Sequence, residues 1–467
     1  MAEFRTENDS LGPVDVPTDA LYGAQTQRAK ENFQISSLRF PRLFIRSMGI
    51  VKRAAALANL KLGLLDGLIA NAIVAAAERV EAGDVDDAFV LDIFQTGSGT
   101  STNMNANEVI GNLASLELGG QLGDKSVHPN DHVNMSQSSN DVIPTVMHVS
   151  AKIGIEEHLK PALENLLASF NEKSLEFDHV LKSGRTHLMD ATPVRLGQEF
   201  LGYAYQIRKG LARLDRASTE LSALALGGTA VGTGINRHVD FPKLAIANIS
   251  DASGLPFREA ENHFEAQSAK DAYVYAAGVL NSIAAALLKI ANDIRHLSSG
   301  PTSGLGEIQL PAIQPGSSIM PGKVNPVMSE AMMMASARVF GNHTTITVGG
   351  QHGNFELNVM MPVMAHAMLE SIEVLSGACD AFRTRCLDGI RADEARCKEL
   401  LELNPSIATA LNAAVGYDKA SKIAKFSAAN KITVRQAAID LGMLSEDELD
   451  RYLNVRDMTE PGIPGDK

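Results

Sequence analysis

Apolar residues recur along this chain at the spacing of helices rather than of strands. Between residues 42 and 82 they alternate in steps of four and three, which places one apolar stripe along a helix. The stripe consists of Phe44, Met48, Val51, Ala55, Ala58, Leu62 and Leu65. Similar stretches occur near 150–175, 195–225, 268–298, 328–345 and 360–390, and alternating strand patterns are scarce. The pattern predicts an all-α protein of long helices joined by a few polar loops.

One apolar stretch, Ala272–Leu288, lies between Asp271 and Lys289 and carries no charge of its own. It includes Asn281 and Ser282 and is shorter than the roughly 20 residues that cross a bilayer. We therefore expect a helix that is buried on all sides. Such a helix has to be covered by other helices, either of this chain or of another subunit.

Length and composition agree with this interpretation. A chain of 467 residues exceeds a single hydrophobic core, so roughly two or three domains are expected. Aromatic residues make up only 5% and Trp is missing, which favours helices over β-sandwiches. The net charge of −13 argues against nucleic acid or an anionic membrane as the main partner.

The cysteines and the N-terminus indicate a cytoplasmic protein. Cys379, Cys386 and Cys397 match neither a zinc pattern nor a disulfide framework, which fits a reducing compartment. The acidic N-terminus lacks the apolar core of a signal peptide. Near the other end, from about residue 395, the chain reads as a small helical unit, with capping-box patterns at Thr433–Gln436 and Ser445–Glu448.

Five loops are unusually rich in Gly, Ser, Thr and Asn, and long loops of this kind are more often functional than filler. They are Gln95–Asn107, His128–Thr145, Gly184–Pro193, Gly227–Asn236 and Gly300–Pro326. The end of the last one, Gly316–Pro326, offers two hydroxyls, a lysine and an amide between glycines and prolines. Such a loop can close over a substrate, although an ordinary surface loop is the simpler alternative. Its apolar Ile319 and Met320 need a surface to pack on.

The glycine turn QTGSGT at 95–100 leads into a helix whose free amides suit a carboxylate. It lacks the ending of a phosphate-binding loop, so it does not indicate a nucleotide. Asn103 and Asn107 follow on one helical face, where a buried amide network or an N-cap is as plausible as a ligand site.

Histidines occur in two of the other loops. His128, Asp131 and His132 match no strong metal motif, and a pair of structural histidines is the better interpretation. His187, within Gly184–Pro193, requires a partner for general acid–base work, and Glu330 is one candidate. Taken together, the loops supply hydroxyls, amides, one Lys and one His, which fits chemistry on an anionic substrate without a metal or organic cofactor.

These loops resemble the signatures of the fumarase/aspartase superfamily, and the resemblance covers almost the whole chain. Within the superfamily the chain is most similar to the class II fumarate hydratase family. The residues that carry the resemblance are QTGSGT (95–100), HPND (128–131), SQSSND (136–141), GRTH (184–187), LGGTAVGTG (226–234), GSSIMPGKVNP (316–326) and GNFELNV (353–359).

Two other functions share this fold. Aspartate ammonia-lyase has the Gly-Ser-Ser loop, but it has Gln where this chain has His187, Ala where it has Gly322, and a different glycine turn. His132 is the exception, because aspartases have His there and some fumarases have Asp, which leaves the role of the second anion site open. A non-catalytic structural protein, like the lens δ-crystallins, is the third possibility. Ser317, Lys323, His187 and Glu330 argue against it, since a structural protein need not keep all four.

The resemblance implies a fold of three domains, at 1–138, 139–394 and 395–467. The central domain is expected to be a bundle of five long helices that forms a twenty-helix core in a homotetramer. Active sites are expected to draw on three subunits, so that cations from several chains converge despite the negative net charge. The implied reaction is the reversible hydration of fumarate to L-malate, a step of the tricarboxylic acid cycle, without a cofactor.

The resemblance also implies a role for each site residue. Ser317 is expected to be the base, with Lys323 and Asn325 holding the carboxylate that gathers charge. His187, paired with Glu330, is expected to act through a water molecule. Substrate binding is assigned to Ser98, Gly99, Thr100, Ser138, Ser139, Asn140, Thr186, Ser318, Lys323 and Asn325. A second anion site is assigned to His128, Asn130 and Asp131, and no metal is expected.

Overall fold

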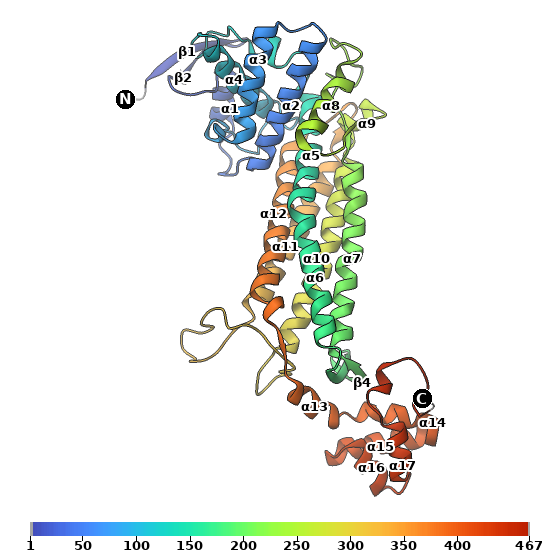
Figure 1. Cartoon of the computed structure of the whole chain (residues 1–467). Coiled ribbons are helices and arrows are strands. Elements are labelled where there is room, and N and C mark those ends of the chain that lie inside the picture. Colours follow the sequence, from blue (N-terminus) through green and yellow to red (C-terminus); the bar gives the residue numbers. More distant parts are fainter. Residues whose placement is uncertain (1–2, 466–467) are drawn as a thin grey trace. The chain divides into compact units, whose positions relative to one another are not determined.

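The structure, a computed structural model, describes residues 3–465, and Met1, Ala2, Asp466 and Lys467 lie outside this range. The chain divides into two compact units, and Figure 1 labels helices and strands along the chain. Unit 1 consists of Met1–Pro161, Gly210–Ala284 and Ala335–Gly377, and unit 2 of Ala162–Lys209, Ala285–Met334 and Ala378–Lys467. The three-domain division stays a prediction.

Unit 1 begins with an antiparallel hairpin followed by a group of helices. The hairpin pairs β1 (Phe4–Asp9) with β2 (Gly12–Pro17). The helices that follow are α1 (Ala24–Asn32), α2 (Arg42–Lys61), α3 (Gly67–Ala82) and α4 (Thr100–Glu117), with a short η1 (Asp86–Ala88) before α4. The stripe predicted at 42–82 is therefore two helices, α2 and α3, which pack against each other. The break falls at Asp66, whose carboxylate caps α3 by accepting from the amides of Leu68 (2.9 Å) and Ile69 (3.3 Å).

A nearly continuous helical stretch starts at α5 (Ser139–Gly154). It passes through a π-helical turn, η3 (Ile155–Leu159), and goes on as α6 (Lys160–Glu176). Another π-helical turn, η2 (Pro129–Val133), precedes α5. Unit 1 also contains α8 (Phe241–Ser253), which packs on α2, and α9 (His263–Ser268). Two short pairings complete it, β5 (Ala223–Leu224) with β6 (Arg258–Glu259) and β8 (Gly353–Asn354) with β9 (Leu357–Asn358).

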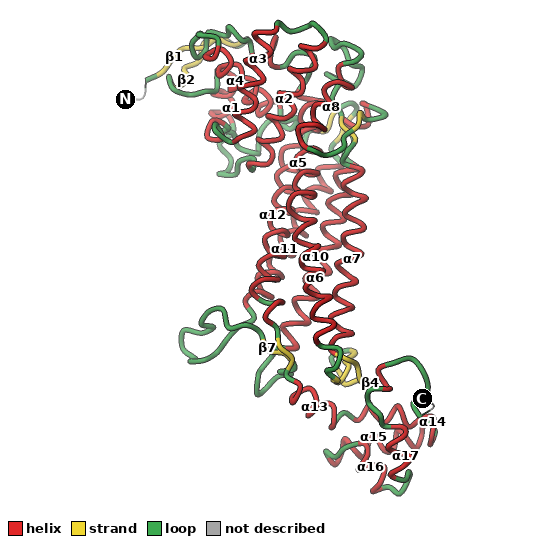
Figure 2. The backbone as a smooth tube through the Cα atoms, viewed as in Figure 1, coloured by secondary structure: helices red, strands yellow, loops and turns green. Residues whose placement is uncertain are grey.

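Four long helices each contribute a segment to both units, and Figure 2 shows how far helices dominate the chain. They are α7 (Leu196–Glu220), α10 (Asp271–Leu297), α11 (Val327–Gly350) and α12 (Met361–Arg385). In unit 2, aromatic rings join α6 to α7, since Phe200 contacts Phe170 and Phe177 with ring centroids 6.2 and 5.1 Å apart. These helices confirm the predicted long helical stretches.

The helix α10 contains the apolar stretch Ala272–Leu288. It is long and apolar enough to cross a membrane by composition alone, which a core helix of a globular protein also satisfies. Half of its most apolar window is buried inside this chain. Burial on all sides is therefore not reached within the residues that the structure describes, because Tyr275, Ser282, Ala285 and Lys289, on one face of the helix, are exposed.

Unit 2 holds a β-hairpin, β3 (Leu181–Thr186) with β4 (Met189–Arg195), and a two-residue pairing of β7 (Ile308–Gln309) with β10 (Arg391–Ala392). After η4 (Leu387–Gly389) the chain ends in short helices around a core that includes Leu401, Ile423 and Leu449. These elements are α13 (Glu394–Glu402), η5 (Pro405–Leu411), α14 (Asn412–Val415), α15 (Tyr417–Asn430), α16 (Val434–Asp440), α17 (Glu446–Tyr452) and η6 (Asp457–Thr459).

Both predicted helix starts in this segment occur where expected. Ser445 and Glu448 form the full reciprocal capping box of α17. At α16 the Thr433 hydroxyl accepts from the Gln436 amide, but the Gln436 side chain bonds Asp440 instead of reaching back. Strands are as scarce as predicted, because the described residues contain five two-stranded sheets and no larger one. The all-α fold class is confirmed.

Candidate active site

The loop Gly316–Pro326, in unit 2, is closed at its base by hydrogen bonds between its own ends. The Gly316 amide donates to the Lys323 carbonyl at 2.9 Å, and the Asn325 side-chain amide donates to the Gly316 carbonyl at 2.6 Å. A Cβ at Gly316 would lie 2.3 Å from the Lys323 carbonyl oxygen, so only glycine fits. This closure fixes the spacing between Ser317 and the polar pair Lys323 and Asn325.

The Ser317 hydroxyl sits at the turn of this loop and is surrounded by backbone donors. Its Oγ accepts from the amide of Ile319 at 3.2 Å and from the amide of Met320 at 2.9 Å. Donors aimed at an oxygen stabilise negative charge on it. The geometry therefore favours a hydroxyl that can give up its proton.

The rest of the loop faces solvent in the single chain. Ile319 is 83% exposed and Met320 50% exposed, and the side chains of Ser318 and Lys323 are exposed as well. The expectation that Ile319 and Met320 pack on something is thus not met within this chain. Two apolar side chains held in water at a loop tip indicate a surface that another molecule covers.

His187 occupies the first position of the two-residue turn between β3 and β4. Both His187 (φ 57°) and Leu188 (φ 61°) have left-handed backbones, the conformation that such a hairpin turn requires and that Asn and Gly adopt most easily. A histidine in this place is strained, and strain of this kind concentrates at functional sites. Thr186 precedes it at the end of β3, and both side chains are exposed.

The predicted partner of His187, Glu330, lies in the first turn of α11 and is also exposed. Within the described residues no hydrogen bond or ion pair joins the side chains of His187 and Glu330. Their pairing stays a prediction, and one chain alone does not bring it about.

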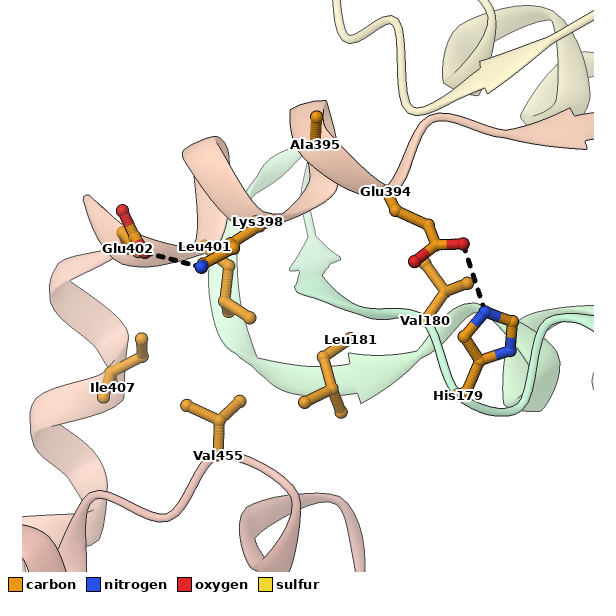
Figure 3. Close-up of a pocket in the computed structure, with 10 residues that line it drawn as sticks. All are labelled: His179, Val180, Leu181, Glu394, Ala395, Lys398, Leu401, Glu402, Ile407 and Val455. Atoms are coloured by element: carbon orange, nitrogen blue, oxygen red, sulfur yellow. Dashed lines mark hydrogen bonds and ion pairs between the residues drawn. The ribbon is translucent and has the colours of Figure 1, made fainter.

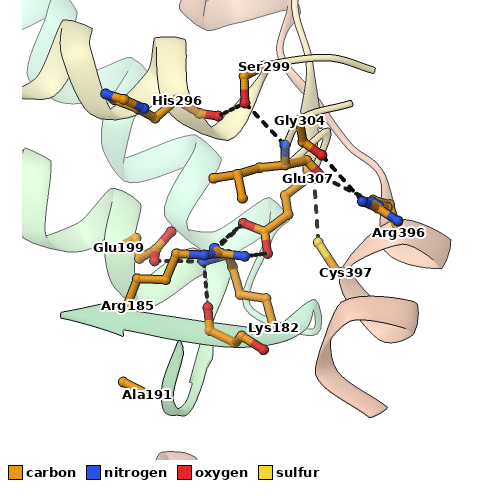
Figure 4. A network of polar contacts seen from close by, with 12 residues as sticks. Lys182, Arg185, Ala191, Glu199, His296, Ser299, Gly304, Glu307, Arg396 and Cys397 are labelled. Carbon is orange, nitrogen blue, oxygen red and sulfur yellow. Dashed lines mark hydrogen bonds and ion pairs between the residues drawn. The ribbon is translucent and has the colours of Figure 1, made fainter. Parts of the chain in front are cut away.

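Behind the hairpin, a network of buried charges holds β3 in place (Figure 4). Glu307 is fully buried and accepts two hydrogen bonds of 2.8 Å from Arg185. Lys182, also fully buried, lies 3.3 Å from Glu307 and 2.9 Å from Glu199. Burial raises the pKa of the Glu199 carboxyl, although Lys182 counteracts this effect. Lys182 and Arg185, both on β3, thus neutralise Glu199 and Glu307, and β3 ends directly before His187.

In unit 1, two helix N-termini bring together the hydroxyls predicted to bind substrate. α4 starts at Thr100 after Gly99, which has a left-handed backbone, and α5 starts at Ser139. The Thr100 Oγ1 lies 2.7 Å from both Ser98 Oγ and Ser139 Oγ, and Ser139 Oγ is 3.4 Å from Asn140 Oδ1. Hydroxyls and amides beside two helix N-termini form a cluster of donors suited to a carboxylate.

Other segments fix this cluster. The Asp141 carboxylate accepts from the amides of Ser138 (2.9 Å), Gly227 (3.0 Å) and Thr229 (2.8 Å). Burial raises the pKa of Asp141, while these amides oppose the shift. The backbone at Gly97 packs directly against the segment at 353–359. A Cβ at Gly97 would lie 1.8 Å from the Val359 carbonyl oxygen. Three of the loops singled out in the sequence therefore meet around Ser138–Asn140.

The predicted second anion site is a separate place in unit 1. His128 caps η2 by accepting from the amides of Asn130 (3.2 Å) and Asp131 (3.1 Å) at Nδ1, and His132 Nδ1 accepts from the His128 amide at 2.9 Å. The Asp131 carboxylate lies 3.4 Å from the same Nδ1 atom of His128. His128, Asn130 and Lys125 line a cavity of about 300 Å³. Among the described residues, no group of three His, Cys, Asp or Glu could hold a metal.

Unit 2 also contains a larger cavity, of about 530 Å³ (Figure 3). Leu181, Leu401 and Val455 contribute apolar surface, and the pair His179–Glu394, 3.2 Å apart, lies at its edge. None of its lining residues is among those that the sequence predicted for the site. Its apolar lining offers no cluster of donors for a dicarboxylate, so we do not assign the substrate to it.

Three buried groups that support these clusters were missed by the sequence prediction. The sequence predicts Asp141 and Glu307 only as members of the loops His128–Thr145 and Gly300–Pro326, and it assigns no role to Lys182. Each is charged and buried, which a single sequence does not reveal, because their partners lie far along the chain. The spacing Lys182-x-x-Arg185 before the histidine was the one available signal.

Comparisons with known proteins define the class of protein first. The family model described as "Lyase" matches residues 12–341, and the one described as "Fumarase C C-terminus" matches residues 407–460. The structure also superposes on a solved class II fumarase from Schistosoma mansoni, with a TM-score of 0.96 and 36% identity over 98% of this chain and 99% of that chain.

Sequence relatives make the assignment more specific. The chain is 53% identical to "Fumarate hydratase class II 2" of Bradyrhizobium diazoefficiens, over 98% of this chain and 97% of the relative. It is 49% identical to "Fumarate hydratase, mitochondrial" of Saccharomyces cerevisiae, over 98% of this chain and 95% of the relative. The chain therefore belongs to the class II fumarate hydratase family of lyases, and the predicted family and its fumarase/aspartase-like fold are confirmed.

Proposed function

We propose that this protein catalyses the reversible addition of water to fumarate, giving L-malate, without a metal or an organic cofactor. The observation that carries the proposal is the near full-length identity of about half the residues with class II fumarate hydratases. His187 in the strained hairpin turn supports water rather than ammonia as the added molecule, because aspartases have Gln at that position.

A single assay tests the proposal against its two alternatives. Purified protein is mixed with fumarate, alone and with ammonia, and the absorbance of fumarate is followed. We expect the absorbance to fall without ammonia. A fall that requires ammonia would identify an aspartase, and no change under either condition would indicate a non-catalytic protein.

The chemistry of the reaction explains what the loop Gly316–Pro326 contributes. In the direction of dehydration, a proton leaves the carbon beside one carboxylate, and that carboxylate becomes an aci-carboxylate with extra negative charge. Ser317 is the proposed base, favoured by the two amides that donate to its Oγ. Lys323 and Asn325 are the proposed groups that hold the charged carboxylate, since the closed loop keeps both near Ser317.

His187 and Glu330 are proposed to handle the water molecule. The ring of His187 would take a proton from attacking water or give one to departing hydroxide, and Glu330 would orient the ring. Thr186 and Ser318, which are exposed beside the proposed catalytic residues, are assigned to substrate binding.

The remaining substrate carboxylate is assigned to the donors of unit 1. These are Ser98, Gly99, Thr100, Ser138, Ser139 and Asn140. The 2.7 Å contacts among the hydroxyls support the assignment, because they form one connected group at two helix N-termini. His128, Asn130 and Asp131 are proposed as a second anion site, to which the His128 ring, with Nδ1 already accepting, can donate from Nε2.

We further propose a homotetramer in which each active site draws on three subunits. The exposed Ile319 and Met320, the lack of contact between His187 and Glu330, and the incomplete burial of α10 support this assembly. A tetramer would cover these apolar surfaces and place the proposed groups together. Light scattering on the purified protein tests it, with four chains expected. The proposal includes a cytoplasmic location. It also includes no nucleic-acid or membrane partner, an expectation that the net charge of −13 supports.

A further inference from the structure

In the part of the chain that the structure describes, Lys52 in unit 1 is buried and forms no ion pair. Lys52, on α2, is 0% exposed, and its Nζ donates to Asn134 Oδ1 at 3.1 Å and to Gln137 Oε1 at 3.0 Å. Burial lowers the pKa of Lys52 to about 7, although the charge of Asp141 opposes the shift. Burying an ammonium group carries a desolvation penalty, whereas burying an apolar side chain of the same length is favourable. Filling the core does not explain such a residue.

The two acceptors of Lys52 belong to the segment that leads into the proposed substrate-binding residues. Gln137 directly precedes Ser138, whose hydroxyl accepts from the Asn140 amide at 3.2 Å and so starts α5. Asn134 is joined to Gln137, because its side-chain amide donates to the Gln137 carbonyl at 3.2 Å. A movement of the Lys52 side chain would therefore displace Gln137 and, through the adjoining backbone, Ser138.

The side chain of Asn134 also explains the roles of Asn103 and Asn107, which the sequence did not decide. Asn103 and Asn107 donate their side-chain amides to Asn134 Oδ1 at 3.2 and 3.1 Å. They thus form a buried amide network rather than an N-cap. Because Asn103 and Asn107 lie on α4, this network ties the helix that starts at Thr100 to the segment before α5.

A second side chain of α2 holds the same segment. Asn59 lies two helical turns after Lys52, donates to the Met135 carbonyl at 3.0 Å and accepts from the Ser136 hydroxyl at 2.8 Å. Ser136 has a left-handed backbone (φ 64°), so the segment bends sharply between these two anchors. A bend of this kind needs anchors on both sides to keep one conformation.

We propose that Lys52 is a positioning residue, which acts through Gln137 and Asn134 to hold Ser138, Ser139 and Asn140 in the geometry that binds a substrate carboxylate. The inference rests on the proposed assignment of these three residues to substrate. Lys52 itself does not touch substrate, and its loss affects binding rather than the chemistry at Ser317.

A matched control exists in the same unit. Lys270 is also buried, at 2% exposure, and burial lowers its pKa to about 7 as well. Its Nζ donates to the backbone carbonyls of Ala266, Gln267 and Ala269 at the end of α9, and to no proposed site residue. Lys270→Met therefore measures what the loss of a buried ammonium does to stability alone.

The test compares steady-state fumarate hydration by Lys52→Met, Lys270→Met and Asn140→Ala, with thermal unfolding of each. We expect Lys52→Met to raise KM about tenfold with a smaller change in kcat, as for the loss of a charged hydrogen bond. Lys270→Met is expected to lower Tm without changing KM. An unchanged KM in Lys52→Met, beside a raised KM in Asn140→Ala, overturns the inference. An unchanged KM in Asn140→Ala overturns the site assignment instead.

Should Lys52→Met fail to fold, Gln137→Leu removes the acceptor and keeps the lysine. Its KM is expected to rise as well, because one of the two hydrogen bonds of Lys52, the one to Gln137, is lost. A folded Gln137→Leu with the KM of the wild type overturns the inference independently of Lys52→Met.

Discussion

Arg185 and Glu307 are joined by two hydrogen bonds of 2.8 Å each, with the Glu307 carboxylate fully buried. The pair connects β3 to the start of the long segment that ends in the Ser317 loop, because Glu307 immediately precedes β7. The Glu307 carbonyl also accepts from the Asp393 amide at 2.9 Å, next to α13. One buried pair therefore holds three segments that lie far apart in the sequence.

Arg185→Met should destabilise the protein by about 3–5 kcal/mol, because it leaves the Glu307 charge buried with only Lys182 near it. Chemical denaturation followed by circular dichroism measures the change in unfolding free energy. The control is Lys398→Met, which removes a 3.9 Å pair with Glu402 whose side chains are 77% and 57% exposed. That pair is expected to contribute less than about 1 kcal/mol. Equal losses in the two variants would show that the buried pair is not a main support of the hairpin.

His187→Asn separates the chemistry of the histidine from the shape of its turn. Asn adopts the left-handed backbone at φ 57° more easily than most residues, so the hairpin should keep its fold. Without the imidazole, kcat is expected to fall by about 10²–10⁴, the usual contribution of a general acid–base group. Leu188→Asn, at the neighbouring turn position with φ 61°, is the control and should keep its kcat. A near-normal rate in His187→Asn would refute the acid–base role.

The sequence predicts features that depend on neighbouring residues. The caps of α16 and α17 follow from Thr433 and Ser445, and the long helices follow from the apolar period. The loop at Gly316–Pro326 was recognisable because glycine, proline and hydroxyl residues follow one another there. Local rules are enough for such features, since the interactions that create them span only a few residues.

The supports of the candidate site could not be predicted in this way. Lys52 bonds Gln137 across 85 positions of the sequence, and Asp141 bonds Gly227 across 86. A lysine within an amphipathic helix is normally read as a solvated position, so its burial becomes visible only once α2 has packed. The pairing of His187 with Glu330 stays a prediction, because in the proposed tetramer it would depend on contacts between chains.

Acid should destabilise the folded protein partly through His148. Burial lowers the pKa of His148 to about 4, helped by the charge of Lys270, and its Nδ1 lies 2.8 Å from the Ala223 carbonyl. Between pH 6.5 and 4 the unfolded chain therefore binds a proton that the folded chain does not, so stability falls as the pH falls through this window. Unfolding free energies of the wild type and His148→Asn, measured across it, should differ in slope, with the variant less sensitive. Parallel curves would contradict the assignment.

The sharing of active sites between subunits predicts that two inactive variants restore each other. Ser317→Ala and His187→Asn are each expected to lose most of their activity when purified alone. If these residues meet at one site from different subunits, subunits mixed at random in equal amounts give about one quarter of sites with both groups intact. The mixture is dissociated in denaturant, reassembled, and assayed for fumarate hydration.

Ser317→Ala mixed with Lys323→Met is the matched control for this experiment. Both residues lie on one loop, so every site receives a loop that lacks one of them, and the mixture should stay inactive. Recovery in the first mixture alone supports sites built from several chains. If the first mixture recovers no activity while the reassembled wild type is active, Ser317 and His187 of one site lie on the same chain. The exposed Ile319 and Met320 would then need another explanation.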